Sequence, residues 1–133
     1  MELKLGYQEM IKQALTQIET LSLEQGKSLL GDPNTVFVDI RDIRELEREG
    51  MIPEAFHAPR GMLEFWVDPE SPYFKEIFGS GKRLILYCGS AWRSALATET
   101  LQKMGVPAVC HLEGGFSAWK QAGLPVMQKE RQT

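Results

Sequence analysis

Hydrophobic positions form three different patterns along the chain, and each pattern predicts a different element. From Tyr7 to Ile18 apolar residues recur every three or four positions, which predicts an amphipathic helix. The unbroken β-branched and apolar run Thr35–Ile40 is typical of a central parallel strand, buried on both faces. The apolar run Leu84–Tyr87 ends at a cysteine, and small residues then lead into a helical pattern, which predicts a strand, a tight loop and a helix. Together these patterns indicate an α/β fold.

Two helix starts carry the spacing of a capping box, in which a short polar residue and a Glu or Gln three positions later satisfy each other's backbone N–H groups. Ser22 with Gln25 predicts one start, and Asp42 with Glu45 predicts another, whose helix ends at Gly50. The other elements that we expect are a helix to about residue 30, a long aromatic connection at 63–74 and a last strand at 108–112.

Composition narrows the class of protein. A chain of 133 residues is the size of one domain, and its net charge of -3 without a basic cluster argues against a nucleic-acid surface. No apolar stretch approaches the length of a membrane-spanning helix, so we expect a cytoplasmic protein that does not bind membranes. In that compartment Cys88 and Cys110 are expected to be thiols. His57 and His111 stand in no metal-ligand spacing, and we expect neither a metal nor a cofactor.

The chemistry is expected at Cys88, where the strand feeds a helix N-terminus. If the loop from Cys88 to Arg93 curls into a ring, the backbone amides of Gly89–Arg93 can point at one spot, with Arg93 as a fixed positive charge. Such surroundings stabilise a thiolate, which is the nucleophilic form of cysteine. The alternative is a buried structural cysteine followed by an ordinary turn. The small residues and the position of the arginine favour the nucleophile.

Three motifs in order resemble the rhodanese (sulfurtransferase) family, and in particular its single-domain, thiosulfate sulfurtransferase-like members. The loop Tyr87–Ala95 is similar to the active-site loop of the family, Leu112–Trp119 with Ala122–Val126 to its closing motif, and Val38–Arg41 to its opening motif. The resemblance implies a central, mainly parallel five-stranded sheet with helices on both faces, and an extra N-terminal helix outside it. The division expected is an N-terminal extension at 1–19, the rhodanese-like domain at 20–127 and a polar tail at 128–133.

The resemblance also implies an activity and a set of site residues. A Cys88 thiolate would take the outer sulfur of an anionic donor such as thiosulfate and pass it, as a persulfide, to cyanide or a thiol, with a protein acceptor left open. In this assignment Cys88 is catalytic, the substrate is bound by Gly89, Ser90, Ala91, Trp92 and Arg93, and the loop is positioned by Asp39, Arg41 and Ser94.

Two other functions stay open at this point. Phosphatases and arsenate reductases of related fold have five residues between the cysteine and the arginine, whereas this chain has four, which favours sulfur chemistry. A binding module with the same fold and no turnover is the third possibility, although such modules commonly lack the cysteine.

Individual positions carry smaller expectations. Glu54 stands where the family has a glycine, which implies an altered turn or strain if a positive φ is needed there. Trp92 either narrows access to the nucleophile or packs beneath the loop. For His57 we expect a packing or hydrogen-bonding role, and for Cys110 a core thiol, with a resolving role toward Cys88 as the minority alternative. The glycine pair Gly114–Gly115 suggests a backbone that takes unusual torsions or passes close to another element.

Overall fold

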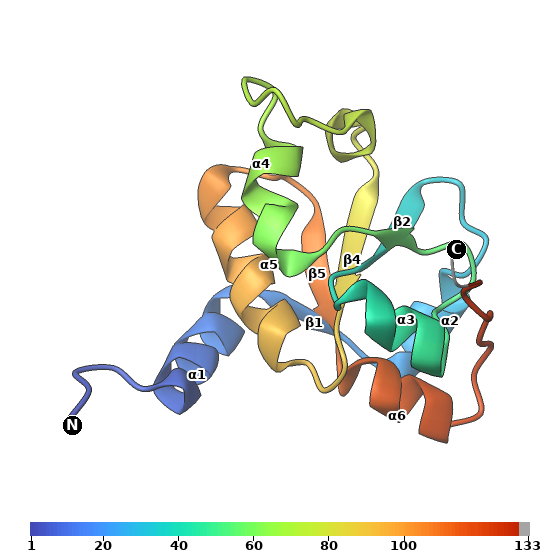
Figure 1. The fold of residues 1–133 in the computed structure, drawn as a ribbon, viewed down its shortest axis with the longest axis horizontal. Coiled ribbons are helices and arrows are strands. Elements are labelled where there is room, and N and C mark those ends of the chain that lie inside the picture. The colour runs from blue at the N-terminus through green and yellow to red at the C-terminus, as the bar shows by residue number, and fades with distance from the viewer. Residues whose placement is uncertain (131–133) are drawn as a thin grey trace.

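A five-stranded sheet forms the centre of the computed structural model, which describes residues 1–130 (Figure 1). All the strand pairings in this sheet are parallel, in the order β1-β5-β4-β2-β3. The strands are β1 (Glu19–Leu21), β2 (Thr35–Asp39), β3 (Phe56–His57), β4 (Arg83–Tyr87) and β5 (Val109–Leu112). The helices are α1 (Tyr7–Gln17), α2 (Leu23–Ser28), α3 (Ile43–Glu49), α4 (Leu63–Val67), α5 (Trp92–Met104) and α6 (Gly115–Gln121), with 3-10 turns at Arg60–Met62 and Glu76–Gly79.

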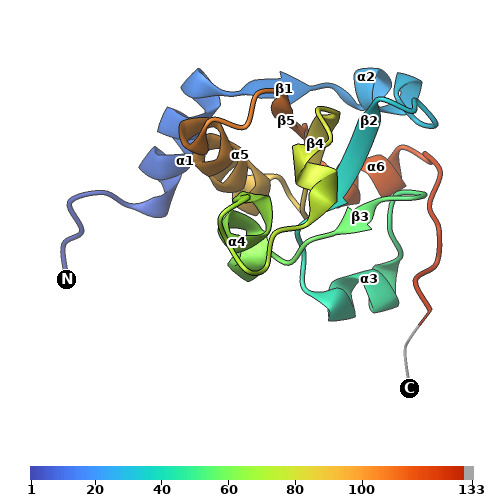
Figure 2. The same cartoon turned by 90° about the horizontal axis from the view of Figure 1, so that it is seen from above.

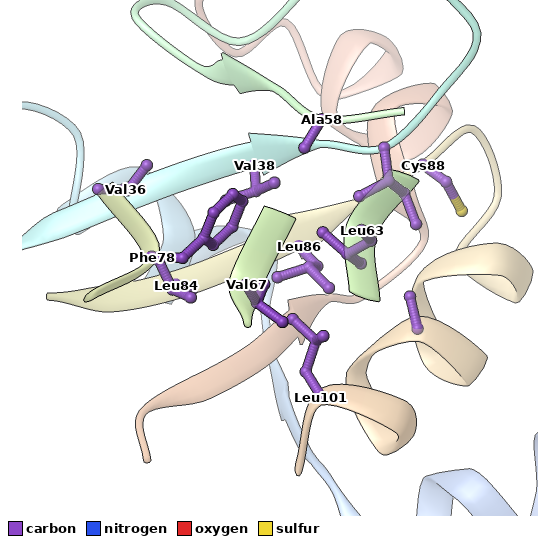
Figure 3. Close-up of a cluster of buried hydrophobic side chains, with 12 residues drawn as sticks. Val36, Val38, Ala58, Leu63, Val67, Phe78, Leu84, Leu86, Cys88 and Leu101 are labelled. Carbon is purple, nitrogen blue, oxygen red and sulfur yellow. The ribbon is translucent and has the colours of Figure 1, made fainter. Parts of the chain in front are cut away.

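The sheet separates two hydrophobic cores because successive side chains of a strand point to opposite faces. On one face Leu84, Leu86 and Cys88 pack against α4 and α5, and Figure 3 shows this cluster. On the other face Ile85 and Tyr87 pack with the buried aromatic residues of α6. In Figure 2 these helices lie on both sides of the strands. The expected α/β sheet with helices on both faces is therefore confirmed.

Both predicted capping boxes are present. Gln25 N donates to Ser22 Oγ, and Ser22 N donates to the Gln25 side chain. Asp42 and Glu45 make the same reciprocal pair at the start of α3, whose C-cap is Gly50.

Two segments differ from the simplest expectation. The aromatic segment at 63–74, expected to be a connection, contains the short helix α4. Glu54 adopts a φ of 64°, a left-handed conformation that favours glycine, so this turn carries the backbone strain that the sequence suggested.

The N-terminal helix α1 packs along α5 (Figure 1). Ala14 is fully buried in α1, and the Gln102 side chain donates to the Gln17 carbonyl at the end of that helix, 2.7 Å away.

None of the helices in residues 1–130 is long and apolar enough to cross a bilayer. Of the polar tail expected at 128–133, residues 131–133 lie outside the described part of the chain.

Candidate active site

Cys88 directly follows β4, the central strand of the sheet, at the carboxyl edge where α/β proteins place their ligand sites. Only 1% of its surface is exposed. Its sulfur accepts a hydrogen bond from the backbone N–H of Ser94, at 3.3 Å. That donor is one residue beyond the ring of amides expected from Gly89–Arg93, because Ser94 lies in the first turn of α5, where N–H groups have no partner inside the helix.

The first turn of α6 binds the loop after Cys88 through two backbone hydrogen bonds. Phe116 N donates to the Cys88 carbonyl at 2.7 Å, and Ser117 N donates to the Gly89 carbonyl at 3.0 Å. Because a trans peptide points its N–H away from its C=O, the amides that follow these carbonyls are turned away from α6. A Cβ on Gly115 would lie 2.7 Å from both carbonyl oxygens, so the close approach suggested for this glycine pair is present.

The loop enters α5 through a left-handed residue, Ala91, with a φ of 73°. Trp92, the first residue of α5, is 54% exposed and does not pack beneath the loop. Its ring lies against that of Tyr7 from α1, with 5.2 Å between centroids. The N-terminal helix therefore reaches the rim of the Cys88 loop.

Arg93 extends over the loop toward α3. Its guanidinium donates to both carboxylate oxygens of Glu45, at 2.9 and 3.0 Å. A Cβ added to Gly89 would lie 3.3 Å from Arg93 Nη2, so the guanidinium rests against the loop backbone. Hydrogen bonding to Glu45, and to a smaller extent the nearby Cys88 sulfur, raises the pKa of Arg93 against the opposing effect of burial. The predicted cation is present beside the loop, already paired with a carboxylate.

Asp39 and Arg41 form a fully buried ion pair behind the loop. Arg41 Nε donates to Asp39 Oδ1 at 3.0 Å, and Nη2 donates to Oδ2 at 2.7 Å. The same guanidinium lies 4.3 Å from the centre of the Phe116 ring and donates to the Gly50 carbonyl. Because Phe116 also binds the Cys88 carbonyl, the ion pair contacts the loop through α6 and not directly.

The side chain of Ser94 contacts His111, a residue outside the predicted site. Ser94 Oγ lies 3.0 Å from His111 Nδ1, and His111 Nε2 lies 2.9 Å from Thr20 Oγ1. Burial lowers the pKa of His111 to about 4, so the ring is neutral at ordinary pH. The sequence signal was a histidine in an apolar strand. Its partners depend on the pairing of β1 with β5, which sequence spacing does not reveal.

The other candidate groups have structural partners. His57 Nε2 lies 2.7 Å from the Arg41 carbonyl, which is the hydrogen-bonding role expected for it. Cys110 is a free thiol in the core on the face opposite Cys88, and burial raises its pKa to about 11, so a resolving role gains no support. Within residues 1–130 no three His, Cys, Asp or Glu side chains gather as metal ligands.

The profile of the Rhodanese-like domain matches residues 22–122. The chain is 31% identical over 116 residues to a protein named sulfurtransferase from Allochromatium vinosum, covering 87% of this chain and 98% of that one. It is 38% identical to an uncharacterised protein of Synechocystis, covering 70% of this chain but only about half, 47%, of that protein's length. A solved structure from Rhodopseudomonas palustris, described as a protein of unknown function and possible tyrosine phosphatase, is 48% identical with a TM-score of 0.92, covering 95% and 97% of the two chains.

The extent of the matched profile and the near full-length match to the Allochromatium protein agree with the sheet order and the loop geometry. We conclude that the chain belongs to the family of rhodanese-like domains.

Proposed function

We propose that the protein is a sulfurtransferase that carries sulfur as a persulfide on Cys88. The family and the relative named sulfurtransferase support sulfur transfer in general. The observation that carries the specific proposal is the hydrogen bond from the Ser94 amide, in the first turn of α5, to the Cys88 sulfur. A helix N-terminus that donates to this sulfur favours its anionic forms, the thiolate and the persulfide.

In the proposed reaction the Cys88 thiolate attacks the outer sulfur of a donor such as thiosulfate. The bond between the two donor sulfurs breaks, and sulfite leaves with its electron pair. Cys88 then holds the transferred sulfur as an anionic persulfide until cyanide or a thiol attacks it and restores the thiolate. A protein cysteine can replace the small thiol as acceptor in the same step. Gly89, Ser90, Ala91, Trp92 and Arg93 are the proposed substrate contacts.

Trp92 is the proposed selector of acceptors because its exposed ring stands at the rim of the loop. An aromatic surface beside the nucleophile restricts approach and offers a stacking face. We expect Trp92→Ala to change the ratio of kcat/KM between cyanide and a bulky thiol. An unchanged ratio would remove Trp92 from the assignment.

A phosphatase is the second candidate, since the Rhodopseudomonas relative is described as a possible tyrosine phosphatase. The four residues between Cys88 and Arg93 make a smaller ring than the five found in phosphatases of related fold, and a smaller ring suits one added sulfur better than a phosphoryl group. The count therefore favours sulfur transfer.

Kinetics with both substrate classes test the proposal. Wild type is expected to transfer sulfur from thiosulfate to cyanide or a thiol, and Cys88→Ala to lose the activity, while Cys110→Ala keeps it as the control. Full transfer by Cys88→Ala would refute the assignment. Hydrolysis of an aryl phosphate by wild type, abolished by the same substitution, would establish the phosphatase instead.

A further inference from the structure

Arg93, the cation of the proposed sulfur site, forms an ion pair with a carboxylate from another element. Glu45 projects from the first turn of α3 and accepts hydrogen bonds from both terminal nitrogens of the Arg93 guanidinium. The Glu45 side chain is only 22% exposed and that of Arg93 is 44% exposed, so solvent screens the pair only in part. One positive and one negative charge therefore stand together at the rim of the Cys88 loop.

Glu45 is held in this position from its own helix. Its Oε2 atom accepts the backbone N–H of Asp42 at 3.0 Å in the capping box, while the same oxygen binds Arg93. The hydrogen bond from Arg93 lowers the pKa of Glu45 despite partial burial, so the carboxylate is ionised at neutral pH. The other two basic side chains near the start of α3 are already occupied, Arg41 by Asp39 and Arg44 by Asp42.

We propose that Glu45 selects sulfur donors by charge: it offsets the attraction of Arg93 for doubly charged thiosulfate and so shifts the preference of the site toward singly charged donors, such as organic thiosulfonates and persulfides. This inference rests on the proposed sulfurtransferase function and names its donor class. A donor bound to Arg93 lies within roughly 6 to 8 Å of the Glu45 carboxylate, because only the width of the guanidinium separates them. Each negative charge on the donor is repelled by Glu45, so a second charge doubles the penalty.

A comparison of thiosulfate with methanethiosulfonate isolates the effect of donor charge. Both present an outer sulfur bonded to a sulfonyl sulfur, but the first ion has two negative charges and the second has one. In both cases the Cys88 thiolate bonds to the outer sulfur, the S–S bond of the donor breaks, and sulfite or methanesulfinate leaves with the electron pair. The same Cys88 persulfide results.

The test substitution is Glu45→Gln. Glutamine keeps the capping hydrogen bond at this position and a hydrogen-bond acceptor for Arg93, while the charge is removed. We expect the ratio of kcat/KM for thiosulfate to that for methanethiosulfonate, measured at constant ionic strength, to rise by about five- to tenfold over wild type. Glu47→Gln is the matched control, because it removes the same charge two positions along α3, and we expect it to leave the ratio within about twofold of wild type.

The outcomes separate the two proposals. If wild type transfers sulfur from both donors and Glu45→Gln leaves their ratio unchanged, or lowers both activities equally, Glu45 only supports the loop and the charge-selection inference is wrong. If Glu47→Gln raises the ratio as much as Glu45→Gln, the effect belongs to net charge and the inference is also wrong. If wild type takes sulfur from neither donor, the proposed sulfurtransferase function fails, and the inference fails with it.

Discussion

His111 is a buried histidine that supports the Cys88 loop through one hydrogen bond. Its ring connects the Ser94 hydroxyl on α5 with the Thr20 hydroxyl on β1. These neutral partners can satisfy both ring nitrogens of an uncharged imidazole, one as donor and one as acceptor. Protonation would place a charge in an environment 1% exposed, which is why the pKa of the ring falls.

This burial predicts a specific loss of stability in acid. The folded-state pKa of His111 is about 4, below the ordinary 6.5, so the unfolded chain binds more protons between these values. The free energy of unfolding should therefore decrease as pH falls from 6.5 to 4, by at most about 1.4 kcal/mol per pH unit from this group. Urea unfolding of wild type and His111→Asn at several pH values measures it. The variant should show a shallower slope, and equal slopes would contradict the expected titration.

At the scale of elements, the start of α6 functions as a support for the loop. Two of its backbone amides bind the Cys88 and Gly89 carbonyls, and this contact requires a residue without a Cβ at Gly115. The guanidinium of the buried pair of Asp39 with Arg41 contacts the Phe116 ring in the same turn. The arrangement of Cys88, the proposed nucleophile, thus depends on the backbone of a helix other than the one that donates to its sulfur.

Gly115→Ala should displace the loop, because the added methyl would lie 2.7 Å from two backbone oxygens that cannot rotate away. We expect sulfur transfer to fall by at least about tenfold and the free energy of unfolding to fall by about 1–3 kcal/mol. Gly123→Ala is the control, since Gly123 also has a positive φ but has no neighbour within 4 Å of an added Cβ. It should lose about 1 kcal/mol and keep its activity. Equal activity losses in the two variants would mean that backbone strain alone is responsible.

Helix α1 contacts α5, and Ala14 is the buried residue of this helix. Ala14→Glu would bury a charge there and should release the helix. We expect amide hydrogen exchange in residues 7–17 to accelerate by about tenfold or more, while Gln13→Glu, at an exposed position of the same helix, leaves exchange near the wild-type rate. Exchange that stays slow in Ala14→Glu would show that other contacts hold α1.

Across the whole chain, features that depend on neighbouring residues could be predicted from the sequence, whereas contacts between distant residues could not. The capping pairs at Ser22 and Asp42 and the amphipathic run of α1 depend on neighbours in the chain, and the structure confirms them. The pairing of Arg93 with Glu45 and of Ser94 with His111 joins residues 48 and 17 positions apart. Such contacts follow from strand order and helix placement, which a single sequence does not encode in its spacing.

The loop after Cys88 shows the same difference between local and long-range features. The sequence placed Cys88 at a helix N-terminus correctly, and its sulfur accepts a hydrogen bond from Ser94 N, one residue beyond the expected range. That the amides of Gly89–Arg93 point at one anion stays a prediction. The contacts of α6 with the Cys88 and Gly89 carbonyls, which fix the direction of these loop peptides, are long-range and have no local signal in the sequence. The strained Ala91 then sets where α5 begins.

If Cys88 carries a transferable sulfur, the persulfide can be detected by mass. We would incubate the protein with thiosulfate and map its peptides by mass spectrometry. We expect the Cys88 peptide to gain the mass of one sulfur atom, the Cys110 peptide to stay unchanged, and cyanide to remove the added mass. A Cys88 peptide that never gains sulfur would refute the persulfide and favour a binding module.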